Sequence, residues 1–410
     1  MLGHKKLVYL DHASATPLDS KVAKYMHDLS IAVYANPSGI TKLSVQAHAI
    51  VEDARATVAK LLFAHANEII FTGSGTESDA LAIRGVITNY KLLIKNEKTK
   101  RVIPHIVTTT IEHPAVLENC RMLEKNGEAE VTYISCDGQG IIDPKEIKAA
   151  LKENTVLVSV MYANNEIGTI QPIAKIAKQI RHYRKINEST LPLLHTDACQ
   201  AMNYIPLLNI EKLGVDLMSF NSSKIYGPKG VGFLYRKRGV ELSPLYAGGG
   251  QEFGMRSGTQ DTVSIAGAAR ALEETWKMKE KESERLTKIR DHGIEKLLAL
   301  SSSDYEIILN GDQELRLPNN INISISGISS ELLVVELDAR GIAVSAKSAC
   351  KSDDPDESYV IDALHNAQGI QKASIEGSIR ISLGRTTTKD DIATLAGALK
   401  TILDTYKEWK

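Results

Sequence analysis

The chain has 410 residues, of which 43% are hydrophobic, and its 49 basic and 50 acidic side chains leave a formal net charge of -1. This length allows one large hydrophobic core and a smaller second one, and the balanced charge excludes the basic surface typical of nucleic-acid-binding proteins. Because there is neither an apolar window approaching the roughly 18 residues of a membrane span nor an apolar signal-peptide core, we expect a cytoplasmic protein that binds no membrane.

Short apolar segments alternate with stretches of helical periodicity through about residue 265. This alternation predicts an α/β fold in which helices cover both faces of a mostly parallel sheet. The strands expected in this part are 68–71, 106–110, 131–134, 156–161, 191–195, 215–220 and 231–235.

A long helical run over 263–300 leads to a second set of expected strands. These are 307–310, 321–325, 342–345 and 378–383. We therefore predict a large domain at 16–262 and a smaller C-terminal α+β domain at 263–410, with residues 1–15 packing against the smaller domain. No repeat or low-complexity linker separates the two parts, so we expect them to pack closely.

A glycine- and serine-rich segment, TGSGTES at 72–78, follows the first expected strand and precedes a helical stretch. Backbone N–H groups at a helix N-terminus bind phosphate, and the hydroxyls of Ser74 and Thr76 add further donors. The segment lacks the third glycine of the dinucleotide fingerprint and the Gly-Lys-Ser/Thr of a P-loop, so it favours neither dinucleotides nor nucleoside triphosphates. Taken alone, it is equally well explained as an N-capped turn.

Three further polar residues follow expected strands, where an open α/β sheet binds its ligands. The imidazole of His113 can stack on a planar ring or move a proton, although a capping or core histidine has the same appearance. Asn165 lies in an Asn-Asn-Glu cluster that is otherwise an ordinary turn. Asp197 can accept a charged N–H from an aromatic heterocycle, or it can cap a helix instead.

Lys224 lies in the segment SFNSSKIYGPKG at 219–230, between two expected strands. A lysine there loses hydration unless it is exposed or its amine is covalently engaged, as in Schiff-base chemistry on a carbonyl cofactor or substrate. By itself Lys224 is most simply a solvated loop lysine. In chain order, however, a phosphate-binding turn, a histidine, an aspartate and a lysine match the needs of pyridoxal 5'-phosphate (PLP).

The sequence closely resembles the cysteine desulfurases of the NifS/IscS type, which belong to the class V aminotransferases of PLP fold type I. Matching motifs extend through nearly the whole chain. They are LDHASATP at 10–17, NP at 36–37, GTES at 75–78, EHPAV at 112–116, NNEIG at 164–168, DACQ at 197–200, KIYGPKG at 224–230, GMRSGT at 254–259, SAC at 348–350 and SIRISLGR at 378–385. The resemblance implies a large domain with a mostly parallel sheet and a smaller C-terminal α+β domain.

The resemblance also implies a set of cofactor-binding residues. They are Gly75, Thr76, His113, Asn165, Asp197, Gln200, Asn221, Ser223, Lys224 and Thr259. Within this set, Asp197 pairs with the ring nitrogen, and Lys224 forms the Schiff base. Thr259 reaches the phosphate of the partner subunit, so the expected assembly is a homodimer with shared active sites. Ser223 stands where the family usually has a histidine, and as a neutral group it donates more weakly to the phosphate.

Two further positions match the family's substrate and sulfur residues. Arg380 alternates with apolar residues in SIRISLGR, and its guanidinium can grip the α-carboxylate of the substrate, with Asn36 as a second ligand. A surface ion pair is the alternative for this arginine. Cys350 lies in the small, polar segment KSACKSDDPDES at 347–358, which predicts an exposed loop thiol suited to a nucleophile. Cys120 and Cys136 are better interpreted as structural.

Together these residues predict a PLP-dependent L-cysteine desulfurase that gives L-alanine and a persulfide on Cys350. Lys224, Cys350 and His113 are the expected catalytic groups, and we expect no metal site. The persulfide sulfur would pass to an acceptor protein for iron–sulfur clusters, thio-cofactors or tRNA. A selenocysteine lyase, another class V lyase or aminotransferase, and a non-catalytic sulfur-transfer scaffold subunit remain as alternatives.

Overall fold

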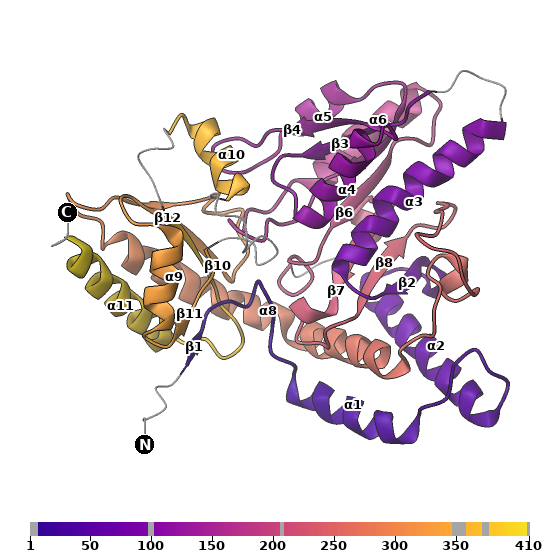
Figure 1. Ribbon diagram of the computed structural model, residues 1–410, viewed down its shortest axis with the longest axis horizontal. Coiled ribbons are helices and arrows are strands. Elements are labelled where there is room, and N and C mark those ends of the chain that lie inside the picture. Colours follow the sequence, from indigo (N-terminus) through magenta and orange to yellow (C-terminus); the bar gives the residue numbers. More distant parts are fainter. Residues whose placement is uncertain (1–6, 97–101, 206–208, 347–357, 371–376, 408–410) are drawn as a thin grey trace.

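The computed structural model describes residues 7–96, 102–205, 209–346, 358–370 and 377–407. Its largest element is a seven-stranded sheet with the strand order β2-β8-β7-β6-β5-β3-β4 (Figure 1). The strands are β2 (Ile69–Thr72), β3 (His105–Thr109), β4 (Glu130–Ile134), β5 (Thr155–Ser159), β6 (Leu193–Asp197), β7 (Leu217–Asn221) and β8 (Gly232–Arg236). Strands β3 to β7 pair in parallel, and β8 is antiparallel to both of its neighbours. The predicted mostly parallel α/β sheet is confirmed.

Helices pack on both faces of this sheet, so its strands are buried on both sides. On β2, for example, Ile70 packs into one hydrophobic cluster, and Ile69 and Phe71 pack into the other. The first cluster includes α3 (Gly75–Asn96) and α4 (Pro114–Lys125). The second includes α2 (Lys42–Leu62), α6 (Ile173–Ile186) and part of α8 (Thr262–Leu298). The shorter or more peripheral elements of this part are α1 (Ser20–Ala32), η1 (Ala66–Glu68), α5 (Pro144–Ala150), α7 (Ile210–Leu213), η2 (Ser222–Lys224) and η3 (Glu252–Gly254).

A smaller antiparallel sheet, in the order β12-β10-β9, forms the C-terminal part of the molecule. Its elements are β9 (Ile307–Leu309), β10 (Asn320–Ile325), α9 (Ser330–Asp338), α10 (Tyr359–Gln368), β12 (Gly377–Ser382) and α11 (Lys389–Lys407). Strand β1 (Val8–Tyr9) pairs in parallel with β11 (Ile342–Ala343), so the start of the chain lies against this part. Strand β1 was not predicted from the sequence, because a strand of two residues is too short to show an alternation of apolar and polar side chains.

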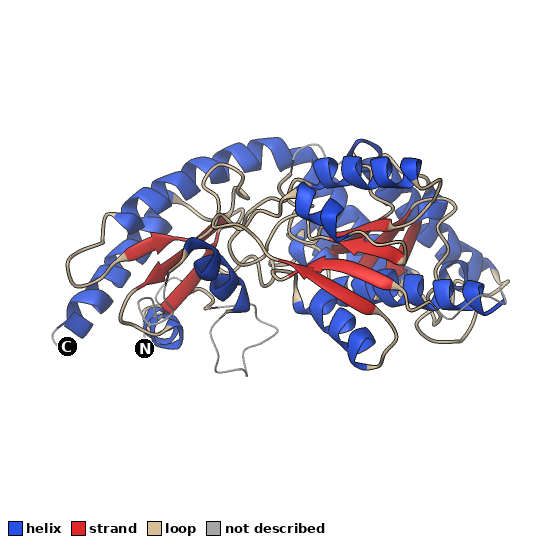
Figure 2. Cartoon of the chain, turned by 90° about the horizontal axis from the view of Figure 1, so that it is seen from above, coloured by secondary structure: helices blue, strands red, loops and turns tan. Residues whose placement is uncertain are grey.

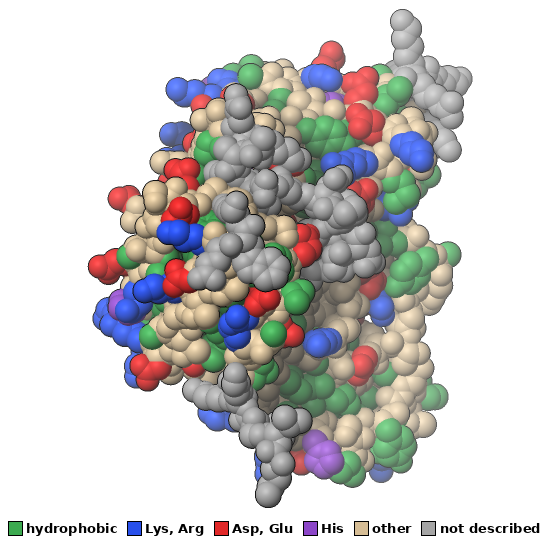
Figure 3. Space-filling model, turned by 60° about the vertical axis from the view of Figure 1, so that its left-hand side comes forward, with side chains coloured by type: hydrophobic (Ala, Val, Ile, Leu, Met, Phe, Trp, Pro, Cys, Tyr) green, Lys and Arg blue, Asp and Glu red, His purple; other side chains and the backbone are tan. Residues whose placement is uncertain are grey.

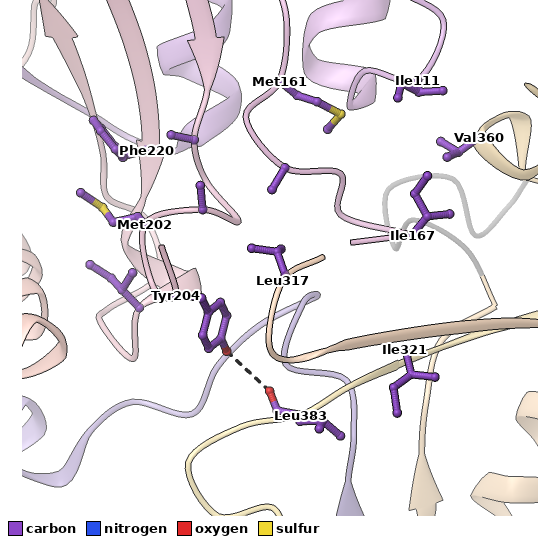
Figure 4. Close-up of a cluster of buried hydrophobic side chains, with 14 of the residues drawn as sticks. Ile111, Met161, Ile167, Met202, Tyr204, Phe220, Leu317, Ile321, Val360 and Leu383 are labelled. Carbon is purple, nitrogen blue, oxygen red and sulfur yellow. Dashed lines mark hydrogen bonds between the residues drawn. The ribbon is translucent and has the colours of Figure 1, made fainter. Parts of the chain in front are cut away.

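Helix α8 connects the two sheets. It has 37 residues and is capped by Asp261, whose carboxylate accepts the Ser264 N–H at 3.0 Å. Figure 2 shows it running along both parts of the molecule. A continuous hydrophobic cluster also joins them, with Phe220 and Met161 on one side and Leu317 and Ile321 on the other (Figure 4). The two sheets therefore share a core.

The surface shows no charge bias on the face seen in Figure 3, where acidic and basic side chains are interspersed over the described residues. This agrees with the formal net charge of -1. Within the described ranges, every helix is too short or too polar to cross a bilayer.

Candidate active site

One cavity lies at the carboxyl ends of the large-sheet strands and brings together nine of the predicted site residues. These are Gly75, Thr76, His113, Asn165, Asp197, Gln200, Asn221, Lys224 and Arg380. Ala13, Ser14, Asp79 and Cys199 also contribute to its lining. All but Arg380 among the nine come from connections or strand ends of the large sheet, and Arg380 comes from β12 of the smaller sheet. The cavity therefore lies between the two parts of the molecule.

The glycine-rich turn ends at the first residue of α3, Gly75. A methyl group on Gly75 would lie 2.8 Å from Cys199 Sγ, so only glycine fits at this position without displacement. The turn is braced by Glu77, which accepts the Gly73 N–H at 2.6 Å and pairs with Arg256 at 2.9 Å. The Ser74 hydroxyl accepts the Glu77 N–H at 3.1 Å, so the N-capping left open by the sequence is present, and the N–H groups of Gly75 and Thr76 are the ones suited to a phosphate.

Two carboxyl groups line the cavity near the end of β6. Asp197 Oδ1 accepts the Cys199 N–H at 2.8 Å. Asp79 is 1% exposed, and its Oδ1 lies 3.5 Å from His195 Nε2 with no hydrogen-bond partner among the described residues. Burial, together with the charge of Asp197, raises the pKa of Asp79 well above its usual range. Asp79 was not predicted, although it follows Gly75 by four residues and therefore lies on the same face of α3.

Lys224 ends the short helix η2, which directly follows β7. Its Nζ donates hydrogen bonds to the carbonyl oxygens of Ala13, at 2.8 Å, and Ser14, at 2.5 Å. Gln200 donates to the Ala13 oxygen as well, at 3.0 Å. The amine is thus directed into the cavity and held there by an N-terminal turn that sequence reasoning did not connect with it.

Arg380 is almost fully buried, with 1% of its surface exposed. Its Nη2 donates to Asp11 Oδ1 at 2.8 Å and to Ser14 Oγ at 2.6 Å, and its Nη1 donates to the Asn165 carbonyl oxygen at 3.1 Å. Its Nε has no partner among the described residues. The ion pair that the sequence left open as an alternative is present, with Asp11, but the guanidinium is buried and lines the cavity instead of lying at the surface.

His113 caps α4, and its Nδ1 accepts the Ala115 N–H at 3.1 Å. Burial lowers the pKa of His113, although the charge of Asp197 opposes this effect. A neutral imidazole with an accepting Nδ1 carries its proton on Nε2. The capping role that the sequence left open is therefore real, and it coexists with a place in the cavity lining.

Four predicted site residues are not in the cavity lining. The Ser223 hydroxyl donates to Asn221 Oδ1 at 2.9 Å, so it is Asn221 that reaches the cavity. Asn36 and Thr259 are exposed. Cys350 lies outside the described residues, so its role stays a prediction. Within the described ranges, there is also no cluster of three potential metal ligands.

Comparison with known proteins places this architecture in a family. The profile described as Aminotransferase class-V matches residues 8–395. Cysteine desulfurase IscS of Dictyoglomus turgidum is 40% identical over 413 aligned positions, which cover 99% of this chain and 98% of the relative. The enzyme of the same name from Methanosarcina thermophila is 39% identical, over 94% of this chain and 89% of the relative. A solved structure titled NifS-like protein has a TM-score of 0.86 at 34% identity, covering 97% of this chain and 100% of that chain. The chain therefore belongs to the class V aminotransferase family.

Proposed function

We propose that this chain is a PLP-dependent L-cysteine desulfurase that releases L-alanine and keeps the substrate sulfur as a protein-bound persulfide. The observation that carries the proposal is one cavity shared by Lys224, Asp197 and Arg380. They supply an amine for a Schiff base, a carboxylate for a ring nitrogen and a guanidinium for an α-carboxylate. The names of the relatives, cysteine desulfurase IscS, support the same activity.

The lining fits PLP in charge and in hydrogen-bonding capacity. The N–H groups of Gly75 and Thr76, at the start of α3, suit a phosphate. Asp197 suits a protonated ring nitrogen. Two buried lining atoms, Asp79 Oδ1 and Arg380 Nε, have no hydrogen-bond partner among the described residues, which is typical of a cavity that receives a polar ligand.

When bound, PLP supplies a ring that accepts the electrons left when the substrate Cα loses its proton. Lys224 Nζ would hold the cofactor, and as a free amine it would move the Cα proton. Asp197 keeps the ring nitrogen protonated, and Arg380 orients the substrate by its carboxylate. The carbonyl oxygens of Ala13 and Ser14 would orient the Lys224 amine toward the cavity while it is free.

Sulfur transfer requires a thiolate, and we assign that role to Cys350. Its sulfur attacks the substrate sulfur, and an S–S bond forms as the bond between the substrate Cβ and its sulfur breaks. The electron pair of the broken bond stays with the carbon, and protonation there gives L-alanine. The Nε2 proton of His113 is suited to exchange with the substrate thiol.

The assembly and the acceptor belong to the same proposal. Asn36 and Thr259 are exposed, which suits residues that act on a second copy of the chain, so we assign the functional form to a homodimer. We also propose a cytoplasmic location and a protein acceptor for the sulfur. We retain 16–262 and 263–410 as the two domains, and the pairing of β1 with β11 supports assigning residues 1–15 to the smaller one.

Lys224→Ala tests the proposal most directly. The purified wild-type protein is expected to be yellow, to contain a borohydride-reducible cofactor linkage, and to form alanine and sulfide from L-cysteine in the presence of a thiol reductant. Lys224→Ala should lose the linkage. Lys229→Ala, at an exposed lysine in the same segment, should keep it.

The possible failures point to different conclusions. A linkage that persists in Lys224→Ala would move the cofactor to another lysine. A yellow wild-type protein that releases no sulfide from cysteine would have another class V activity. A colourless wild-type protein would favour the scaffold alternative.

A further inference from the structure

The N-terminal turn at 11–14 accepts hydrogen bonds from both cationic side chains of the cavity, Arg380 and Lys224. Its Asp11 carboxylate and Ser14 hydroxyl accept hydrogen bonds from Arg380 Nη2, at 2.8 Å and 2.6 Å. Its Ala13 and Ser14 carbonyl oxygens accept from Lys224 Nζ. The Ser14 hydroxyl also donates to Asp11 Oδ1 at 2.9 Å, which ties the two Arg380 acceptors together. The turn thus contacts the groups that an amino-acid substrate would contact.

A carboxylate binds a guanidinium best through two parallel hydrogen bonds along one edge. In Arg380, Nη1 donates to the Asn165 carbonyl oxygen, and Nη2 is held by the turn. The buried Nε has no partner among the described residues, although Arg380 lines the cavity. A ligand carboxylate can use the edge formed by Nε and Nη2 only if it takes Nη2 from Asp11 and Ser14.

We propose that Asp11 is a specificity-determining residue that holds Arg380 in place of the substrate α-carboxylate and exchanges with it when substrate binds. This inference rests on the proposed function, because it takes an α-amino acid as the ligand. The exchange replaces one carboxylate by another, so the buried guanidinium is never left without a negative partner, which would be costly. A ligand that lacks a carboxylate cannot replace Asp11 and gains nothing from Arg380.

The geometry distinguishes this role from that of a structural ion pair. Asp11 is more exposed than its partner, with side-chain exposures of 20% for Asp11 and 2% for Arg380. In a purely structural ion pair, we would expect the N–H groups of the buried arginine all to have acceptors. The Nε of Arg380, however, has no acceptor among the described residues. A comparable pair, Asp19 with Arg385 at 2.8 Å, lies outside the cavity, and both of its side chains are 17% exposed. Asp19 therefore provides a matched control.

The test measures the affinity of the PLP-loaded protein for two amines that differ by a carboxylate. L-Alanine and ethylamine are titrated into wild type, Asp11→Asn and Asp19→Asn, and the change in the cofactor absorption spectrum gives each dissociation constant. Asp11→Asn removes the competing charge and should bind L-alanine about tenfold more tightly, equivalent to about 1.4 kcal/mol, with unchanged affinity for ethylamine. Asp19→Asn should bind both ligands as wild type does.

Unchanged or weaker L-alanine binding by Asp11→Asn would overturn the proposal. An equal gain in affinity for both amines would also overturn it, because it would indicate easier access to Lys224 instead of exchange at Arg380. If Asp11→Asn does not fold, Ser14→Ala provides a milder form of the test. It loosens the hold of Asp11 and should shift L-alanine affinity in the same direction by a smaller factor. A failure of the proposed function is visible separately, because it affects the cofactor and sulfide assays of the wild-type protein.

Discussion

Lys279 lies within α8 with 2% of its surface exposed, and its Nζ has no hydrogen-bond partner among the described residues. Its Nζ lies over the ring of Trp276, 4.4 Å from the ring centroid. Burial lowers the pKa of Lys279 to about 7. An ammonium group without a counter-ion is costly to bury, so this residue opposes folding wherever it must be charged.

Lys279→Met should therefore increase the free energy of unfolding in a pH-dependent way. Below about pH 7 the folded chain holds a buried charge and the gain is full, on the order of 5 kcal/mol. Between there and the ordinary lysine pKa of 10.5 the folded lysine is neutral while the unfolded one is still protonated, so the gain shrinks as pH rises. Denaturant titrations at several pH values measure it. Lys281→Met, at an exposed position of the same helix, should show neither effect, and a pH-independent gain would contradict the reasoning.

Cys350→Ser should separate cofactor chemistry from sulfur transfer. The variant is expected to keep its colour and its spectral response to L-cysteine, because both depend on Lys224, Asp197 and Arg380. It should lose catalytic sulfide release and protein-bound persulfide, because a hydroxyl is a far poorer nucleophile toward sulfur than a thiolate. Cys120 and Cys136 are buried, and serine substitutions there should retain turnover. Sulfide release by Cys350→Ser at the wild-type rate would favour a lyase that needs only the lysine.

Part of the predicted site, including Gln200 and Asn221, was supplied by the resemblance to a family, and part followed from distinctive residue types at strand ends. Lys224, Asp197 and His113 were identified in this way, and all three line the cavity. Asp11 was quoted only within a family motif and was given no role. Its contact with Arg380 joins residues that are 369 positions apart, and no local pattern encodes such a contact.

Among the elements, helix α2 and the short helix η3 are joined by a buried ion pair. Arg55 Nη1 and Nη2 bond to the two carboxylate oxygens of Glu252 at 2.7 and 2.8 Å. The carboxylate also accepts the Phe71 N–H at 2.8 Å, which extends the link to β2. Glu252 and Phe253 both have positive φ, at 49° and 59°, so this pair holds a segment in a conformation that such residues rarely adopt.

Glu252→Ala should lower the free energy of unfolding by up to about 3–5 kcal/mol, because the buried Arg55 then keeps only Glu52, whose side chain is 42% exposed, as an ionic partner. Thermal or denaturant unfolding measures the loss. Glu118→Ala breaks the exposed pair with Arg121 and should cost less than about 1 kcal/mol. Similar losses in the two variants would show that the burial of the pair contributes nothing.

Element prediction succeeded where apolar runs were long enough to show a period. All seven strands of the large sheet and the long helix α8 fall close to their predicted ranges. The antiparallel orientation of β8 was not predicted, because strand direction depends on how the connection crosses the sheet and not on the composition of the strand. Cap residues such as Asp261 could be identified as helix starts only after the helix itself was known.

For the whole molecule, five large apolar side chains are exposed at and around the connection between α1 and α2. Ile31, Tyr34, Ile40, Leu43 and Val45 are 69%, 77%, 97%, 42% and 58% exposed. Singly exposed apolar residues are common, but such a group on one short segment is typical of an interaction surface. We therefore expect this surface to lie against the second copy in the proposed homodimer.

Ile40→Lys should then weaken the dimer, with a shift toward the monomer in light scattering or sedimentation at low micromolar concentration. The lysine would be forced to lose hydration in the interface, so the shift should be largest in dilute samples. Val335→Lys, at a 65% exposed position of α9, should leave the assembly unchanged. An Ile40→Lys protein that stays dimeric at all concentrations would place the interface elsewhere.

The first residues of the chain pack against its C-terminal part, so they reach their final position late in synthesis. His12 contacts the Ser382 carbonyl oxygen, 370 positions further along, and β1 pairs with β11. The ribosome releases the N-terminal segment first, yet its binding site is completed only when nearly the whole polypeptide has emerged. The large sheet can form during translation, whereas the turn at 11–14 reaches Arg380 only afterwards. A ribosome-bound nascent chain that stops before β12 should therefore protect the large sheet from protease while leaving its first residues open to cleavage.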